Sequence, residues 1–308
     1  MSFSNEVKNE LARLEGQNLC CDKAELYGLL KMSGALTLHK KGMGINFTTE
    51  NAALARRVLQ LLKTNFQLRM EVLTTRSRRL KKNNRYQLRV MPSAEVSQAL
   101  RELCLLQASQ TERAELLQRN CCKRAFLRGT FLGGGSVSRP AGDYHLEIVT
   151  EEHSFAELIR ENMAFFALAA KITDRKNEYI VYLKEGNAIT AFLSIIGAHN
   201  ALLKFENVRI IKEMRNNVNR IVNCETANLN KTVQAAVEQV ETIKFIENVY
   251  GLNNLSPPLR ETAELRLLYP EASLAEIANM SDGKIGKSGI NHRLKKIKQL
   301  AKDLGMTD

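Results

Sequence analysis

The residues in this sequence best suited to metal or redox chemistry are six cysteines: Cys20, Cys21, Cys104, Cys121, Cys122 and Cys224. Zinc sites usually take a Cys-x-x-Cys pair, or combine cysteines with nearby histidines. The sequence contains neither pattern. Two adjacent cysteines are also badly placed to form a disulfide with each other. The spacing therefore predicts six reduced thiols, mostly buried as small apolar residues, with no metal site and no cofactor.

A glycine-rich stretch at residues 127–135 could bind phosphate, but the spacing of its glycines favours helix packing. It has neither the Gly-Lys-Ser/Thr of an ATP-binding loop nor the Gly-x-Gly-x-x-Gly of a dinucleotide site. Gly129 and Gly133 are four residues apart, so they share a helix face on which a second backbone can come close. Glycine costs about 1 kcal/mol inside a helix, which favours a packing function over a flexible loop. Gly134 and Gly135 then suit a helix end with positive φ.

Composition limits the class of partner. The chain has 308 residues, 44% of them hydrophobic, and a formal net charge of +12. This charge suits a polyanion, and by itself it does not separate DNA from RNA or anionic lipid. No apolar run approaches the ~18 residues that a membrane span needs, and the first residues do not read as a secretory signal. We expect a cytoplasmic protein of two or three domains with no membrane association.

The glycine stretch belongs to an internal repeat, whose other elements would position it. The cysteine pairs at residues 20–21 and 121–122 are 101 residues apart, and the same offset continues without a gap through residues 58 and 159. Such a register indicates a duplicated unit. Each copy reads as helix, hairpin, helix, hairpin, helix. The second hairpin of the first copy, within residues 69–90, is eight residues longer than its counterpart.

The two stretches 26–34 and 127–135, in this element order, resemble the paired motifs of LAGLIDADG homing endonucleases. The resemblance implies two motif helices packed side by side at a pseudo-twofold axis. Each half would add an antiparallel sheet to a saddle that sits on DNA. Five glycines are assigned to the packing of the motif helices: Gly28, Gly34, Gly129, Gly133 and Gly135.

Cleavage in that family needs an acidic residue before the last glycine of each motif. The two carboxylates bind divalent metal at the scissile phosphates. This sequence has Ser33 and Gly134 at these positions, and Lys31 and Leu132 at the other acidic position of the motif. Acids elsewhere in the repeats are interpreted as cap or surface residues: Glu50, Asp143 and Glu151. We therefore expect a binding scaffold with no catalytic residues and no metal.

The longer hairpin of the first copy is strongly basic, with no acid between Glu71 and Glu95. One interpretation is a solvated loop tip, which is the usual role of a charge run. The other is phosphate contact, because hairpins are what LAGLIDADG saddles lay against DNA. The phosphate-contact candidates are Arg76, Arg78, Arg79, Lys81 and Lys82.

The C-terminal residues follow a helix-turn-helix pattern. A short helix at 274–280 precedes a turn with two glycines and an amphipathic helix from about 288 to 304. Residues 284–302 contain seven Lys or Arg and no acid. The pattern is similar to the helix-turn-helix of region 4 in bacterial sigma factors. In such modules the first turns of the last helix reach base edges in the major groove.

This placement separates two kinds of contact. Asparagine can pair with adenine and lysine with guanine. The base-contact candidates are Ser288, Asn291, His292 and Lys295. The additional phosphate-contact candidates are Lys287, Arg293, Lys296 and Lys298.

The predicted fold class is α+β: a duplicated αββαββα LAGLIDADG-like saddle with pseudo-twofold symmetry, followed by an all-α helix-turn-helix domain. The expected boundaries are 1–213 for the saddle (repeats about 1–110 and 111–213), 214–256 for a helical linker, and 257–308 for the last domain, with its helix-turn-helix at about 272–305.

Almost the whole chain resembles the WhiA family of bacterial DNA-binding regulators. The resemblance is carried by Ser2-Phe3-Ser4 and by residues 7–11, 121–129, 219–220, 223–228 and 288–294. It implies transcription regulation linked to sporulation in filamentous relatives, and to cell division and chromosome segregation elsewhere.

The sequence leaves two other hypotheses open. One is a metal-dependent LAGLIDADG endonuclease. The other is an interaction scaffold, in which the saddle binds a transcription or division protein and only the helix-turn-helix contacts DNA. The expected partner is double-stranded DNA, with the protein associated with the nucleoid. A monomer is expected because the pseudo-dimer is internal.

Overall fold

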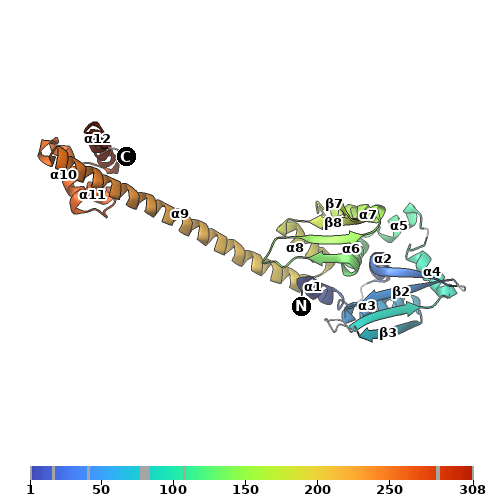
Figure 1. Ribbon diagram of the computed structural model, residues 1–308. Helices are drawn as coiled ribbons and strands as arrows, with labels where there is room; N and C mark the ends of the chain where they lie inside the picture. Colours follow the sequence, from blue (N-terminus) through green and yellow to red (C-terminus); the bar gives the residue numbers. More distant parts are fainter. Residues whose placement is uncertain are drawn as a thin grey trace. The chain divides into compact units, whose positions relative to one another are not determined.

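Two long helices lie side by side at the centre of the N-terminal part of the protein (Figure 1). The structure is a computed structural model that describes residues 2–15, 18–39, 42–76, 84–106, 108–281 and 285–306. It divides into two compact units, Met1–Lys212 and Glu213–Asp308. Each unit is described by itself below.

The first unit contains the αββαββα order twice, as the predicted fold class requires. The first copy comprises α2 (Leu19–Ser33), β1 (Gly34–His39), β2 (Gly42–Thr49), α3 (Ala52–Phe66), β3 (Met70–Arg76), β4 (Asn84–Val90) and α4 (Ala94–Glu102). The second comprises α6 (Asn120–Gly134), β5 (Gly135–Val137), β6 (Leu146–Thr150), α7 (His153–Phe165), β7 (Lys171–Arg175), β8 (Glu178–Leu183) and α8 (Gly186–Ile196). Each copy forms a four-stranded antiparallel sheet, in the order β1-β2-β4-β3 and β5-β6-β8-β7.

The motif helices α2 and α6 run parallel and touch backbone to backbone. A Cβ on Gly28 would lie 2.6 Å from the carbonyl oxygen of Phe126. A Cβ on Gly129 would overlap the carbonyl oxygen of Glu25. One on Gly133 would lie 2.5 Å from the Cβ of Met32. These three glycines therefore allow the two helices to approach more closely than side chains would permit.

The ends of the motif helices differ from the sequence expectation. Gly34 and Gly135 follow the last helical residues with φ of −88° and −84°, which is extended backbone and not the positive φ expected at the end of the second motif. The reason is that each helix runs straight into a strand, so the chain makes no left-handed turn. Glycine is still required, because a Cβ on Gly34 would lie 2.6 Å from the carbonyl oxygen of Leu30 in its own helix, and one on Gly135 would overlap Phe131.

Alanine at Gly129 is expected to lower the free energy of unfolding by about 2 kcal/mol. The added methyl group meets backbone of the partner helix, which cannot rotate away, and this overpacking outweighs the better helix propensity of alanine. Urea denaturation would measure the change. Gly142→Ala is the matched control, since the nearest atom to its Cβ, the carbonyl oxygen of Arg139, lies 3.6 Å away. Equal midpoints for the two variants would contradict the close packing.

Two further helices of the first unit, α1 (Phe3–Leu11) and α5 (Gln110–Leu116), lie outside the repeated order. Helix α1 precedes the first copy but binds the second. Ser4 Oγ donates to the carbonyl oxygen of Val137 at 2.8 Å, on the short strand β5. Ser2 caps α1 by accepting from the amide of Asn5. The N-terminus therefore helps to join the two copies.

In the second unit, helices α10 (Pro257–Leu268), α11 (Leu274–Met280) and α12 (Lys287–Asp303) pack on the last turns of α9 (His199–Val249). Their shared core is apolar. Its fully buried members include Ile243, Ile246, Ala263, Ile277, Ile290 and Ala301. A 3-10 turn, Leu252–Asn254, connects α9 to α10.

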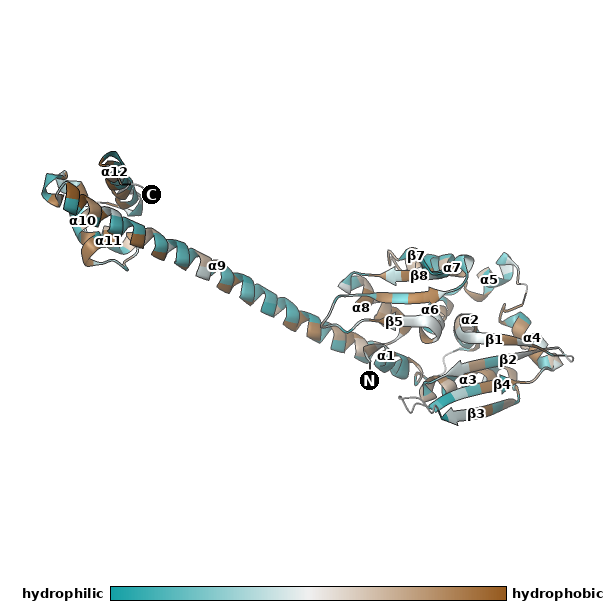
Figure 2. Cartoon of the chain, in the orientation of Figure 1, coloured by the Kyte–Doolittle hydropathy of each residue, from teal (hydrophilic) through white to brown (hydrophobic). Residues whose placement is uncertain are grey.

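Helix α9 is longer than the sequence suggested. A helical linker was expected at 214–256, whereas the structure has one helix of 51 residues that begins before the linker, at His199, and runs through its asparagine-rich segment. The physical reason is that the segment contains no glycine or proline. Asparagine costs less than about 1 kcal/mol per helical position, which is too little to end a helix. Its middle is mostly hydrophilic (Figure 2). Within the described residues, no helix is long and apolar enough to span a membrane.

Candidate nucleic-acid interface

Helix α12 is divided into a buried face and a basic face. Ile290, Leu294, Ile297 and Ala301 are buried against the other helices of the second unit. With about 100° between successive residues, these positions leave the opposite side of the helix to its polar residues. The exposed residues of the described helix include Lys287, Ser288, Asn291, His292, Lys295, Lys296 and Lys298. The buried apolar face of α12 holds the helix in place, and the opposite face presents basic residues to solvent.

The turn before α11 is fixed by side-chain hydrogen bonds. Ser273 and Glu276 form a capping box, in which Glu276 accepts from the Ser273 amide at 2.7 Å. Arg266 is buried and donates to the carbonyl oxygen of Ala272 at 2.6 Å. Burial lowers the pKa of Arg266. Sequence reasoning missed Arg266, because a buried arginine leaves no mark in an apolar pattern.

The four base-contact candidates share the exposed side of α12. Ser288 and His292 lie in its first turns, where a recognition helix meets base edges. Asn291 and Lys295 border a shallow groove between α12 and α9, with Gln239 on the α9 side. The structure thus brings the four together, while their contacts to bases stay predictions.

Two of the phosphate-contact candidates form ion pairs with glutamates of the protein itself. Arg293 is only partly exposed and donates to Glu261 and to Thr262 Oγ1, each at 3.2 Å. Lys298 Nζ lies 3.4 Å from Glu238 on α9, and both side chains are about half exposed. The Arg293 contacts tie α12 to α10. Lys287 and Lys296 are exposed, and all four phosphate contacts stay predictions.

The basic hairpin is described only at its base. Arg76, the last residue of β3, is exposed and pairs with Asn84 across the hairpin. The other candidates of this hairpin lie outside the described residues: Arg78, Arg79, Lys81 and Lys82.

The face of the first sheet opposite its core carries a polar ladder that sequence reasoning missed. Gln87 donates to the side chain of Asn46 at 2.9 Å, and Arg89 donates to Gln87 at 3.2 Å. Gln87 and Arg89 alternate with the buried Leu88 and Val90 along β4. The alternation was visible in the sequence, but which alternate residues meet across strands depends on register. Amide and guanidinium groups on a sheet face can contact phosphate or base edges.

The equivalent face of the second sheet carries different side chains from those of the first. Glu147 and Tyr182 are paired across β6 and β8, as Asn46 and Arg89 are paired in the first sheet. Glu147 accepts from Ser136 Oγ at 3.0 Å and lies 3.1 Å from a ring nitrogen of His145. The two faces differ in their side chains, and each carries both charges, because Glu71 is paired with Arg89 in the first sheet and Lys171 is paired with Tyr182 in the second.

The positions of the catalytic acids, at the C-terminal ends of α2 and α6, hold no carboxylate. Ser33 Oγ donates to the carbonyl oxygen of Leu29 at 3.1 Å. A Cβ on Gly134 would lie 2.8 Å from the carbonyl oxygen of Val149 and would overlap Met32, so there is no room for a side chain. In the part of the chain that the structure describes, no three acidic, histidine or cysteine side chains gather at these ends. The residues present do not fit the divalent metal of a LAGLIDADG nuclease.

Comparison with protein-family models gives three matches along the chain. Residues 19–106 match the WhiA N-terminal LAGLIDADG-like domain, residues 123–215 the WhiA LAGLIDADG-like domain, and residues 218–301 the WhiA C-terminal HTH domain.

Relatives align over the full length. A protein of Alkaliphilus metalliredigens named "Probable cell division protein WhiA" is 50% identical over 309 residues, covering 98% of each chain. One of the same name from Shouchella clausii is 50% identical over 313 residues, covering 99% of this chain and 95% of its own. The crystal structure of full-length DUF199/WhiA from Thermatoga maritima superposes with a TM-score of 0.62 at 28% identity, covering 100% of both chains.

Proposed function

Because the chain belongs to the WhiA family, we propose that it is a DNA-binding regulator that holds double-stranded DNA with α12 and does not cut it. The observation that carries the proposal is the exposed basic face of α12 on a rigid apolar back. A helix of this kind can enter the major groove without reorganising, so its side chains meet base edges at little entropic cost. The net charge of +12 adds attraction to phosphate.

The setting of this activity is cell division. Relatives about 50% identical over nearly the whole chain are named probable cell division proteins. We place the protein on the nucleoid as a monomer, because the two halves of the saddle already supply the pairing that a dimer would provide. Chromatin mapping of the protein in dividing cells would locate its target sites.

DNA binding without cleavage is the expected result in a plasmid assay. The full-length protein should shift DNA fragments, with an affinity that falls steeply as salt rises. In Mg²⁺ or Mn²⁺ it should leave supercoiled plasmid intact, because Ser33 and Gly134 supply no carboxylate to hold the metal. Specific nicking above that of a protein-free control would overturn the non-catalytic assignment.

The two sheet faces of the saddle suit different partners. The ladder of Asn46, Gln87 and Arg89 suits a nucleic-acid backbone. The face with Glu147 and Tyr182 has an aromatic ring beside both charges, with Lys171 paired with Tyr182, and suits a protein partner. The interaction-scaffold hypothesis thus has its support in the second sheet. Glu147→Lys should strengthen DNA binding if that face approaches DNA, and leave it unchanged if the face binds protein.

A further inference from the structure

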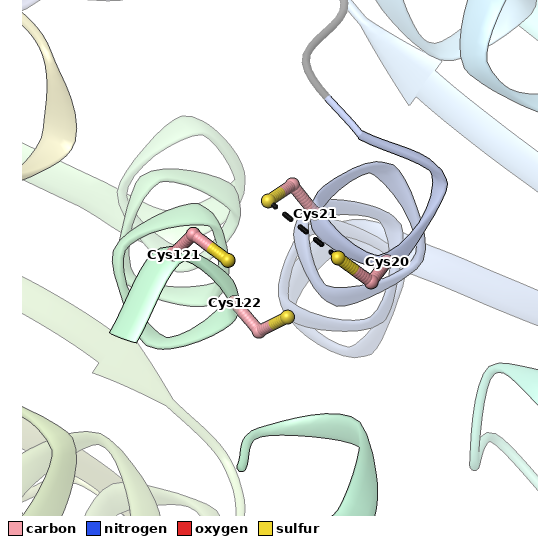
Figure 3. A group of neighbouring side chains, drawn as sticks. All are labelled: Cys20, Cys21, Cys121 and Cys122. Carbon is pink, nitrogen blue, oxygen red and sulfur yellow. Dashed lines mark hydrogen bonds between the residues drawn. The ribbon is translucent and has the colours of Figure 1, made fainter. Parts of the chain in front are cut away.

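Four cysteine side chains meet at the N-terminal ends of the motif helices. Cys20 and Cys21 lie in the first turn of α2, and Cys121 and Cys122 lie in the first turn of α6. Because the helices run parallel, both turns are at the same end of the pair. The four sulfur atoms lie within 4.8 Å of one another, between the two helices (Figure 3). We propose that these four thiolates bind one Zn²⁺ ion and fasten the two halves of the saddle together.

The distances are close to those of a tetrahedral sulfur site. A Zn–S bond of about 2.3 Å places the sulfurs of a tetrahedron about 3.8 Å apart. Cys20 Sγ and Cys21 Sγ are 4.0 Å apart, and no pair among the four exceeds 4.8 Å. Small side-chain rotations would close the remaining gap of about 1 Å, without movement of either helix. The backbone therefore already holds the ligands in a nearly formed site.

The ends of two helices also suit the charge of this site. Four thiolates around Zn²⁺ carry a net charge of −2, and a helix N-terminus stabilises negative charge. The N-cap residues, Asn18 and Arg119, do not cover the first-turn amides with their side chains. The amides of Cys21 and Lys123 donate to the carbonyl oxygens of Asn18 and Arg119, at 2.8 and 3.0 Å, so the amides nearer the helix starts would be the ones to donate to sulfur. Lys123 follows Cys122 directly and adds positive charge on α6, whereas on α2 Asp22 follows Cys21 and Lys23 is paired with Glu102 at 2.7 Å.

The four cysteines differ in burial, and the partly exposed ones mark the side from which an ion could reach the cluster. Cys21 and Cys122 are 1% and 2% exposed, whereas Cys20 and Cys121 are partly exposed. Two ligands are thus held in the core and two face the side from which an ion would arrive. Soft thiolates select zinc over the hard cations Mg²⁺ and Ca²⁺, and the closed set of four protein ligands indicates a structural ion and not a catalytic one.

The first test uses the full-length protein, isolated under reducing conditions without chelator or metal-affinity steps. Mass spectrometry of the metal content should find about one zinc per chain. After chelation, titration with Co²⁺ should give the visible absorption of a tetrahedral thiolate site, and Zn²⁺ should displace that spectrum and raise the thermal midpoint. This readout needs no variant.

The second test compares two serine variants. The double variant Cys20→Ser/Cys121→Ser removes the two partly exposed ligands and should abolish zinc binding while circular dichroism reports a folded chain. The matched control is Cys224→Ser, an exposed cysteine on α9, which should keep the zinc of the unaltered protein. A reconstituted protein without zinc, equal zinc in the two variants, or a mass showing a disulfide within the cluster would each overturn the proposal.

Discussion

Replacing Glu25 by glutamine is expected to lower the free energy of unfolding of the first unit by about 3–5 kcal/mol. Glu25 lies on α2 and is fully buried. Its two carboxylate oxygens accept from Arg57 on α3, at 2.9 and 3.0 Å, and from Arg128 on α6, at 2.8 Å. The substitution keeps the size of the side chain but removes the carboxylate that both buried guanidinium groups contact. Such a loss is a large part of the 5–15 kcal/mol that stabilises a typical domain.

In the unaltered protein, burial lowers the pKa of Arg57, but its hydrogen bonds with Glu25 raise that pKa above its usual value. The substitution removes these hydrogen bonds and keeps the burial. An arginine side chain is not deprotonated in proteins, so Arg57 bears the loss as a buried charge. Arg57 also donates to the carbonyl oxygen of Leu14, and Arg128 donates to that of Ile196 at 3.4 Å. These single carbonyl contacts would remain in the variant, but they carry no negative charge.

The same substitution on an exposed pair provides the control. Glu152 accepts from Lys31 at 2.6 Å with its side chain 54% exposed. Surface pairs of this kind contribute about 0–1 kcal/mol, so Glu152→Gln should unfold close to the unaltered protein. Urea denaturation of the two variants measures the difference. Similar midpoints would show that the buried triad is not what holds the motif helices to α3.

The repeat explains why so much of the fold could be predicted from the sequence. The offset between the two copies predicted the element order, and the resemblance to LAGLIDADG proteins implied that Gly28 and Gly129 lie on facing helices. Helices α11 and α12 were predicted nearly to the residue, because caps and apolar periodicity are local signals. Local signals say nothing about Glu25, whose partners lie 32 and 103 residues away.

The cysteine cluster could have been predicted from the sequence, but the spacing rules for zinc motifs miss it. Zinc motifs are sought within one segment, and adjacent cysteines match none. The repeat, however, places Cys20 and Cys121 at equivalent positions of two helices that the resemblance sets side by side. Equivalent residues near a pseudo-twofold axis must meet each other. Combining the offset with the parallel packing would have predicted the cluster.

Removing the four base-contact candidates together is expected to reduce the preference for specific over nonspecific DNA by about a thousandfold or more. Alanine at Ser288, Asn291, His292 and Lys295 clears the exposed side of α12 and leaves its buried residues in place. Each good base contact contributes about 1–3 kcal/mol of discrimination, and four of them account for the whole effect. Competition binding between a selected target fragment and random DNA, at one fixed salt concentration, measures the preference.

A double variant of the same helix separates base contacts from phosphate contacts. Lys287→Ala/Lys296→Ala removes two exposed charges beside the base-contact face. It should weaken binding to target and random DNA alike, and reduce the slope of log affinity against log salt by about 1.8, or 0.9 for each lost phosphate contact. The quadruple variant should leave that slope nearly unchanged, because its four residues are assigned to bases and not to phosphates. If the quadruple variant keeps its preference for the target, then α12 does not read the sequence. The reading surface must then be sought on the first sheet, along Asn46, Gln87 and Arg89.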